Sequence, residues 1–172
     1  MAMESMQLIS PSIKYKASYI DYIAELGAEE RYPFTLDFEH NHFSELLSKL
    51  KDYSNDVNLP ENTVPSSTYW LVEDSVLVGV TNIRHFLNER IEYCGGHIGL
   101  GIRPTYRGKG LGNLLMKRSI EKLAAMGVSP IHIHCYKENT ASAKVIVDNG
   151  GLLNSEFSES GKVIQRFVVI AT

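Results

Sequence analysis

The pattern of apolar and polar residues predicts a strand and two helices in the first third of the chain. Met6–Ser10 is a short apolar run that a proline stops, which is typical of a strand. Tyr15–Leu26 carries apolar residues at nearly helical spacing and is followed by a glycine, and Asp37–Leu50 resumes that spacing. Between these two expected helices, Glu29–Pro33 has the composition of a loop.

After the polar connection Asp52–Ser67, the pattern changes to that of strands. Thr68–Val72 and Val76–Ile83 are β runs separated by a three-residue turn, so they predict a hairpin, and Gly96–Ile102 predicts a third strand. The expected elements that follow are a helix through Leu115–Ala124, a strand at Ile131–Tyr136, a helix at Thr140–Asn149, and a closing hairpin of Leu152–Phe157 and Val163–Ile170. This order predicts one α/β (α+β) domain over residues 1–172, with a mixed sheet.

Composition narrows the class of protein. The chain has 172 residues and a net charge of −3, which argues against a general nucleic-acid-binding surface. The two cysteines, Cys94 and Cys135, suggest neither a disulfide framework nor a zinc site. Neither a signal peptide nor an apolar run of about 18 residues is visible, so we expect a cytoplasmic protein without a membrane partner.

Arg107–Gly112, with the sequence Arg-Gly-Lys-Gly-Leu-Gly, is the most informative segment and lies between an expected strand and an expected helix. Its glycines let the backbone approach a ligand closely, and the free N–H groups and dipole of the helix favour an anion there. The segment therefore predicts a phosphate or pyrophosphate site. It lacks the Ser or Thr of a P-loop, and its glycine spacing differs from the dinucleotide-binding fingerprint.

The same segment matches Arg/Gln-x-x-Gly-x-Gly/Ala, the pyrophosphate-binding signature of the GNAT superfamily of N-acetyltransferases, which this chain resembles. Leu100–Pro104 is similar to the end of that superfamily's central strand, and Asn139–Gly151 is similar to its Asn-x-x-Ala helix. At finer grain the chain resembles a poorly characterised bacterial branch of predicted acetyltransferases. The segments that carry this likeness are Val64–Val72, Ile83–Asn88, Gly95–Gly99 and Ala143–Gly151.

The resemblance implies a mixed, mostly antiparallel central sheet flanked by helices, and acetyl-CoA as cofactor. It implies that the backbone of Leu100, Gly101 and Ile102 pairs with the pantetheine arm, and that Asn139 and Ser142 lie beside that arm. The expected pyrophosphate site consists of Arg107, Gly108, Lys109, Gly110, Leu111 and Gly112. It also implies a small-molecule or peptide amine as acceptor, and a homodimer is a further candidate assembly.

The catalytic groups are less well defined by the resemblance. Many superfamily members carry a Tyr at the position of Ile146 that protonates the leaving thiolate. Here either another donor serves, with Tyr136 and Ser142 the nearest candidates, or no acid is needed. The usual Glu of the central strand is absent, which leaves His97 as the candidate base and Glu92 and His85 in reserve. The alternative for His97 is a structural hydrogen bond to a neighbouring strand or loop.

Four residues are candidates for contact with the acceptor. Glu30 and Tyr32 lie in the loop that borders the acceptor site in the superfamily, and Arg84 is a candidate ligand for an anionic group, with His85 beside it. For each of these four residues, the alternative to acceptor binding is an ordinary solvated position on the surface. His132 and His134 share one face of a strand, but no third metal ligand is visible, so we expect no metal. The chain is thus expected to be an N-acetyltransferase or, alternatively, a non-catalytic acyl-CoA-binding regulatory module.

Overall fold

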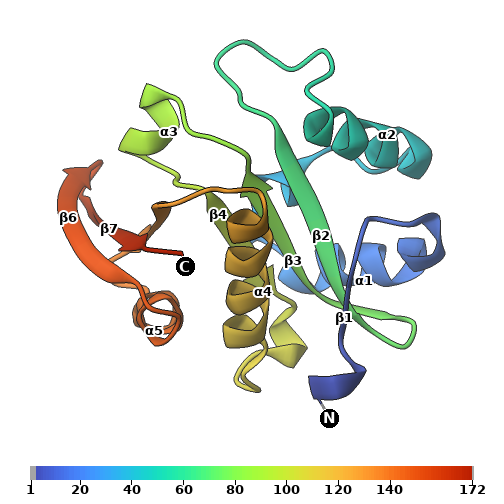
Figure 1. Ribbon diagram of the computed structural model, residues 1–172. Coiled ribbons are helices and arrows are strands. Elements are labelled where there is room, and N and C mark those ends of the chain that lie inside the picture. Colours follow the sequence, from blue (N-terminus) through green and yellow to red (C-terminus); the bar gives the residue numbers. More distant parts are fainter. Residues whose placement is uncertain (1–2, 172) are drawn as a thin grey trace.

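The computed structural model describes residues 3–171, in which two antiparallel sheets pack with five α-helices (Figure 1). The larger sheet has the order β1-β2-β3-β4, with strands Gln7–Ile9, Ser66–Glu73, Val76–Arg84 and Ile98–Ile102. The smaller has the order β5-β7-β6, with β5 at Ile131–Tyr136, β6 at Leu152–Glu159 and β7 at Lys162–Val169. The helices are α1 (Lys16–Leu26), α2 (Phe43–Ser54), α3 (Glu89–Tyr93), α4 (Leu111–Ala125) and α5 (Thr140–Asp148). Short 3₁₀ turns are η1 (Met3–Ser5), η2 (Ile13–Tyr15), η3 (Phe34–Asp37) and η4 (Pro104–Tyr106).

The expected class, α+β with antiparallel strands flanked by helices, is confirmed. Two boundaries differ from expectation. The second helix begins only at Phe43, because Phe34–Asp37 forms a 3₁₀ turn and Phe38 is extended. The stretch before β4 holds the short helix α3, whose first turn is capped by the Asn88 side chain; five residues are too few for a visible helical period.

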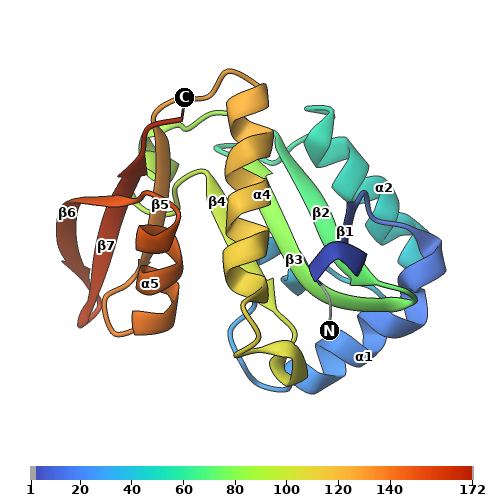
Figure 2. The same ribbon diagram turned by 60° about the horizontal axis from the view of Figure 1, so that its bottom comes forward.

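The two faces of the larger sheet bury different side chains because successive strand residues point to opposite sides. Trp70, Val72 and Val80 pack against aromatic and aliphatic residues of α1 and α2. Leu71 and Val78 pack against Leu111 and Leu115 of α4 on the other face. Figure 2 shows α4 between the two sheets, with α5 beside the smaller one. A core of residues from α4, α5, β4 and β5 joins the sheets: Ile98, Met116, Leu123, Ile131, Ile133 and Ile146 are among its members.

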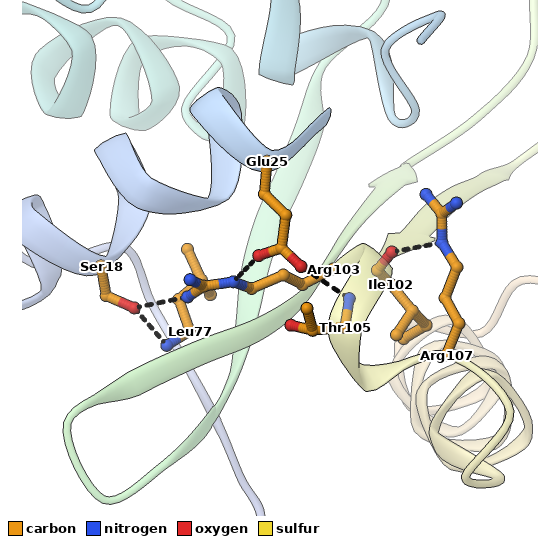
Figure 3. A network of polar contacts seen from close by, with 7 residues as sticks. All are labelled: Ser18, Glu25, Leu77, Ile102, Arg103, Thr105 and Arg107. Carbon is orange, nitrogen blue, oxygen red and sulfur yellow. Dashed lines mark hydrogen bonds and ion pairs between the residues drawn. The ribbon is translucent and has the colours of Figure 1, made fainter. Parts of the chain in front are cut away.

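A polar network ties α1 to the segment that follows β4 (Figure 3). One Glu25 oxygen accepts from Arg103 Nε at 2.5 Å and the other accepts from the Thr105 N–H at 2.6 Å. Ser18 adds a second tie, since its hydroxyl accepts from the Leu77 N–H at 2.8 Å and from Arg103 Nη1 at 3.4 Å. The Glu25 and Arg103 side chains are only 19% and 16% exposed, so solvent weakens this ion pair less than a surface pair.

We expect Glu25→Gln to lower the free energy of unfolding by about 1–2 kcal/mol at neutral pH, since the amide keeps one acceptor but leaves Arg103 without its counter-charge. Burial raises the pKa of Glu25, but hydrogen bonds from Arg103 and Thr105 outweigh it and hold the pKa below its usual range. The ionised Glu25 side chain therefore stabilises the protein above its unfolded-state pKa, and this stabilisation is lost as the pH falls through the folded-state pKa. Urea denaturation at neutral and acidic pH should show the two proteins converging in acid.

The matched control for this substitution is Glu29→Gln. Glu29 pairs with Arg107, but both side chains are about half exposed, at 48% and 47%. We expect a change below about 1 kcal/mol there. Equal losses from the two substitutions would contradict the role given to the Glu25 network.

Candidate functional site

Strands β4 and β5 meet at one end and separate toward the other. The His97 N–H donates to the His132 carbonyl at 2.7 Å, the His132 N–H donates to His97 Nδ1 at 2.9 Å, and Gly96 bridges to Ile133. Within residues 3–171 the two strands form no further ladder, and each is an edge strand of its own sheet. Their facing edges therefore diverge from His97 toward Ile102 and Tyr136.

The backbone of β4 offers unpaired groups on this diverging side. Along an antiparallel ladder, every second residue of a strand bonds to the neighbouring strand. Two bonds show which residues these are: Arg84 N–H donates to the His97 carbonyl, and Arg103 N–H donates to the Val78 carbonyl. Gly99 and Gly101 accordingly bind β3, while Leu100 and Ile102 direct their backbone groups away from β3. The Ile102 carbonyl accepts from Arg107 Nε at 3.0 Å, so the groups of Leu100 remain for a ligand.

The glycine turn leads from this edge to the first turn of α4. Gly108 and Gly110 have φ of 75° and 80°, a left-handed conformation that favours glycine, and open space surrounds the position of a Cβ on Gly108. The first N–H groups of an α-helix have no partner inside the helix, and α4 has no acidic residue in its first turn. These donors and the helix dipole suit a phosphate group, so the residues present fit the pyrophosphate of acetyl-CoA.

The two cations of the turn are placed differently from each other. Both terminal nitrogens of Arg107 donate to Glu29, at 2.8 and 3.2 Å, and this hydrogen bonding raises the pKa of Arg107. Its charge is thus largely matched by a carboxylate rather than free for a phosphate. The Lys109 ammonium lies 5.1 Å from the centre of the Tyr106 ring, and Lys109 is exposed beside the turn. Lys109 is therefore the better placed of the two for a phosphate charge.

The residues expected beside the pantetheine arm lie at the start of α5. Asn139 caps this helix, since its side-chain oxygen accepts from the Ser142 N–H at 3.1 Å. The amide nitrogen of Asn139 is therefore the group that could donate to a ligand. Ile146, at the position of the superfamily's tyrosine, is 1% exposed in the core between the sheets, so this helix supplies no phenol there.

The loop after α1 crosses β4 on the face opposite α4. A Cβ at Gly101 would lie 2.3 Å from the Tyr32 carbonyl oxygen, and one at Gly99 would lie 3.3 Å from the Pro33 side chain. Only glycine at position 101 allows this approach, because the obstacle there is backbone. The glycines of β4 thus hold the loop against the strand, a role that the sequence alone does not reveal.

This loop brings together residues far apart in the sequence. The Tyr32 side chain reaches Tyr136, the last residue of β5, and the Glu30 side chain; burial and hydrogen bonds with both groups raise the pKa of Tyr32. Tyr136 also lies under the Lys162 ammonium, 4.7 Å from its ring centre. Two candidate acceptor-site residues and one candidate acid therefore share one cluster at the diverging ends of β4 and β5.

The His97 imidazole has the geometry of the structural alternative. It is 5% exposed, and its Nδ1 accepts a backbone N–H from β5, so that nitrogen is not free to accept a proton from an acceptor. Burial, together with the neighbouring His132 and Arg84, lowers the pKa of His97 to about 4. This arrangement favours a residue that joins β4 to β5 over a general base.

The two reserve bases lie apart from the cluster of Tyr32. His85 Nε2 is 2.8 Å from the Ser67 hydroxyl, which in turn lies 2.8 Å from the hydroxyl of Ser54 at the end of α2. Glu92 is an exposed residue of α3. Arg84 itself lies on the loop's face, 5.2 Å from the Phe34 ring centre, and donates to the Gly96 carbonyl at 2.8 Å.

Two residues that sequence analysis did not assign complete the junction before β4. His134 Nδ1 accepts from the Gly95 N–H at 2.9 Å, and Arg166 donates twice to the Tyr93 carbonyl, at 2.8 and 2.9 Å. The register of β5 and β7 places His134 opposite Arg166, but nothing in the sequence indicated the partners of these two side chains. Among residues 3–171 no group of three His, Cys, Asp or Glu side chains could hold a metal ion.

Comparison with known proteins gives this arrangement its class. The sequence model of the Acetyltransferase (GNAT) family matches residues 23–149, which is well over half of the chain, and the chain belongs to that family. No curated protein matches it. In the part of the chain described, no helix is long and apolar enough to cross a membrane.

Solved structures share the fold at low sequence identity. A ribosomal-protein-S5-alanine acetyltransferase from Vibrio fischeri aligns with a TM-score of 0.73 and 14% identity, covering 99% of this chain and 96% of that one. The putative acetyltransferase yncA from Salmonella typhimurium, solved with its cofactor acetyl-CoA, gives 0.67 and 14%, covering 98% and 95%. A chimera of the spermidine N-acetyltransferase SpeG from Vibrio cholerae and hSSAT gives a TM-score of 0.61 and 13% identity, covering 97% of this chain and 96% of that one.

The geometry of His97 predicts a pH-dependent contribution to stability. A histidine whose folded-state pKa lies below its unfolded value stabilises the protein at high pH and loses that contribution as the pH falls. In His97→Asn the amide oxygen can still accept the His132 N–H, but the side chain does not titrate. When the pH falls from 7 to 5, the free energy of unfolding should therefore decrease less in this variant than in the wild type, by on the order of 2 kcal/mol. Denaturant titrations at both pH values measure this difference.

The same variant separates the two interpretations of His97. If His97 is structural, His97→Asn keeps the acidic limb of the pH–rate profile unchanged. A variant in which that limb disappears while stability keeps the wild-type pH dependence would identify His97 as the base instead.

Proposed function

We propose that this protein transfers an acetyl group from acetyl-CoA directly to a primary amine. The observation that carries the proposal is the continuous path from the open backbone edge of Leu100 to the free N–H groups at the start of α4. One end of this path suits an extended amide-containing arm, and the other suits a pyrophosphate. Bound acetyl-CoA would supply an activated acetyl thioester between the diverging strands β4 and β5, at the end of this path away from the pyrophosphate site.

The protonation state of the two cysteine thiols supports direct transfer, without an acetylated enzyme intermediate. A thiolate is needed for nucleophilic catalysis, but burial raises the pKa of Cys135 to about 11 and also raises that of Cys94. Both thiols are therefore neutral at physiological pH. A mechanism without an acetyl-enzyme fits this better than one with two half-reactions.

The cluster of Glu30, Tyr32 and Tyr136 supplies the groups for proton transfer. Tyr136 ends β5 on the diverging side, where the thioester sulfur would lie, and its hydroxyl can donate a proton to a departing thiolate. The Glu30 carboxylate can accept a proton from the attacking ammonium, directly or through water. Tyr32 holds both groups through its hydroxyl and, with its raised pKa, remains neutral.

We expect Gly110→Asp to weaken acetyl-CoA binding at least about tenfold, because it would place a carboxylate beside the phosphate site. The nearest obstacle to a Cβ there is the flexible end of the Met3 side chain, so the fold should survive. Titration calorimetry with acetyl-CoA measures the loss.

The matched control is Gly161→Asp, at a left-handed position with open space around it in the turn between β6 and β7. Equal affinity for wild type and Gly110→Asp would exclude this pyrophosphate site.

We expect Tyr136→Phe to lower the turnover number about 10- to 100-fold while acetyl-CoA affinity stays unchanged. This is the lower part of the range for general acid–base catalysis, since a thiol with a pKa near 8.5 leaves without much help. Release of CoA thiol with spermidine, with an N-terminal alanine peptide and with simple alkylamines gives the rate, and Tyr93→Phe, at an exposed tyrosine, is the control. Unchanged turnover in Tyr136→Phe would remove Tyr136 from the mechanism.

The same assay distinguishes the enzyme from a binding module. Tight acetyl-CoA binding without thiol release for any amine would support a non-catalytic acyl-CoA-binding protein and would contradict the proposed transfer.

A further inference from the structure

Arg84 is a half-buried cation without a carboxylate partner. Its Nη1 donates to the Gly96 carbonyl at 2.8 Å, and its guanidinium faces the Phe34 ring at 5.2 Å. None of the ion pairs formed by residues 3–171 includes it. A guanidinium has five N–H donors, so one carbonyl leaves most of them available.

The groups around Arg84 add no negative charge. Burial and the neighbouring Arg90 lower the pKa of Arg84, and the opposing effect comes from the Cys94 thiol, which is neutral. Burial lowers the pKa of His134, like that of His97, to about 4, so both rings are uncharged at neutral pH. The Glu30 carboxylate interacts with Tyr32, at the other end of β4. Removing a cation from water without a counter-charge is unfavourable, so a bound anion would stabilise this position.

Arg84 lies on the face where the acceptor would enter. The two-residue repeat of β3 places it on the same side as Val80, which packs against the α1 and α2 layer. It lies opposite His97, whereas Tyr32 crosses the same strand at Gly101. Four residues of β4 separate these points, a distance of about 13 Å. An acceptor bound along this face would therefore meet the proton-transfer cluster at one end and the guanidinium at the other.

We infer that the acceptor is an amine that also carries a carboxylate, and that Arg84 binds this carboxylate through a charge-assisted, forked pair of hydrogen bonds. The inference rests on the proposed amine acetylation and specifies its substrate class. The amine would approach the Tyr32 cluster while the carboxylate, several bonds away, reaches Arg84. Because a guanidinium matches the planar geometry of a carboxylate, lysine would be an incomplete substitute.

A homologous series of amines tests the inference. The probes are glycine, 4-aminobutanoate, 6-aminohexanoate and 8-aminooctanoate, each paired with its carboxamide, and 1,5-diaminopentane as a dication. For the wild type we expect the carboxylate to exceed its amide in kcat/KM by about tenfold or more at the longer lengths. The difference should lie in KM rather than kcat, and the dication should be the poorest acceptor.

Arg84→Gln removes the charge but keeps a donor for the Gly96 carbonyl, and it should reduce the acid-to-amide ratio to about one while the amides keep their wild-type kcat/KM. Arg84→Lys should restore the ratio only in part. Arg90→Gln removes a neighbouring exposed cation and should leave the ratio unchanged. Melting temperature and acetyl-CoA affinity establish that each variant is folded.

Failure of this inference is separable from failure of the acetylation. If no amine releases CoA, the same probes are titrated into the CoA-loaded protein, and the acid-to-amide ratio of dissociation constants replaces that of kcat/KM. A ratio near one for the wild type at every length would overturn the inference even if every amine is acetylated. An equal loss of the ratio in Arg84→Gln and Arg90→Gln would also overturn it, since it would indicate a diffuse field rather than a binding residue.

Discussion

The junction between β4 and β5 is the constraint on which the site depends. The His97 N–H donates to the His132 carbonyl and the His132 N–H donates to the His97 ring, and these bonds join the edges of the two sheets at one end only. Beyond this point the backbones of the two strands are no longer paired, and a strand edge that would normally be covered is left open. The site exists because this edge remains unpaired while a shared core of α4, α5, β4 and β5 keeps the sheets from separating further.

The remaining parts act by fixing positions relative to that edge. The Glu25 carboxylate fixes the chain as it leaves β4, and so sets where the glycine turn begins (Figure 3). On the opposite face, Gly101 lets the loop of Tyr32 lie directly on the strand, which brings its phenol to Tyr136. A short glycine-rich strand thus serves two partners, through its open backbone edge on one side and its lack of side chains on one face.

The sequence predicted most of this fold because the signals are local. The apolar alternation of β2 and β3, the helical spacing of α4 and the glycine turn between β4 and α4 each lie within a few residues. The site was predicted in part for the same reason. Pairing across the chain was not predictable. That Glu29 would neutralise Arg107, that His85 would bond to Ser67, or that His97 would accept a backbone N–H from β5 depends on residues 18 to 78 positions apart. Such contacts follow from how the sheets are placed, which local patterns do not encode.

The most direct test of the account is amide hydrogen exchange with and without acetyl-CoA. The backbone N–H groups of Leu100 on the open edge and of Leu111 and Gly112 at the start of α4 have no partner in these elements, so they should exchange quickly in the free protein. Bound acetyl-CoA should slow exchange at these positions, while amides of the ladder between β2 and β3 stay as they are. Binding that leaves Leu100 and the first turn of α4 unprotected would contradict the account.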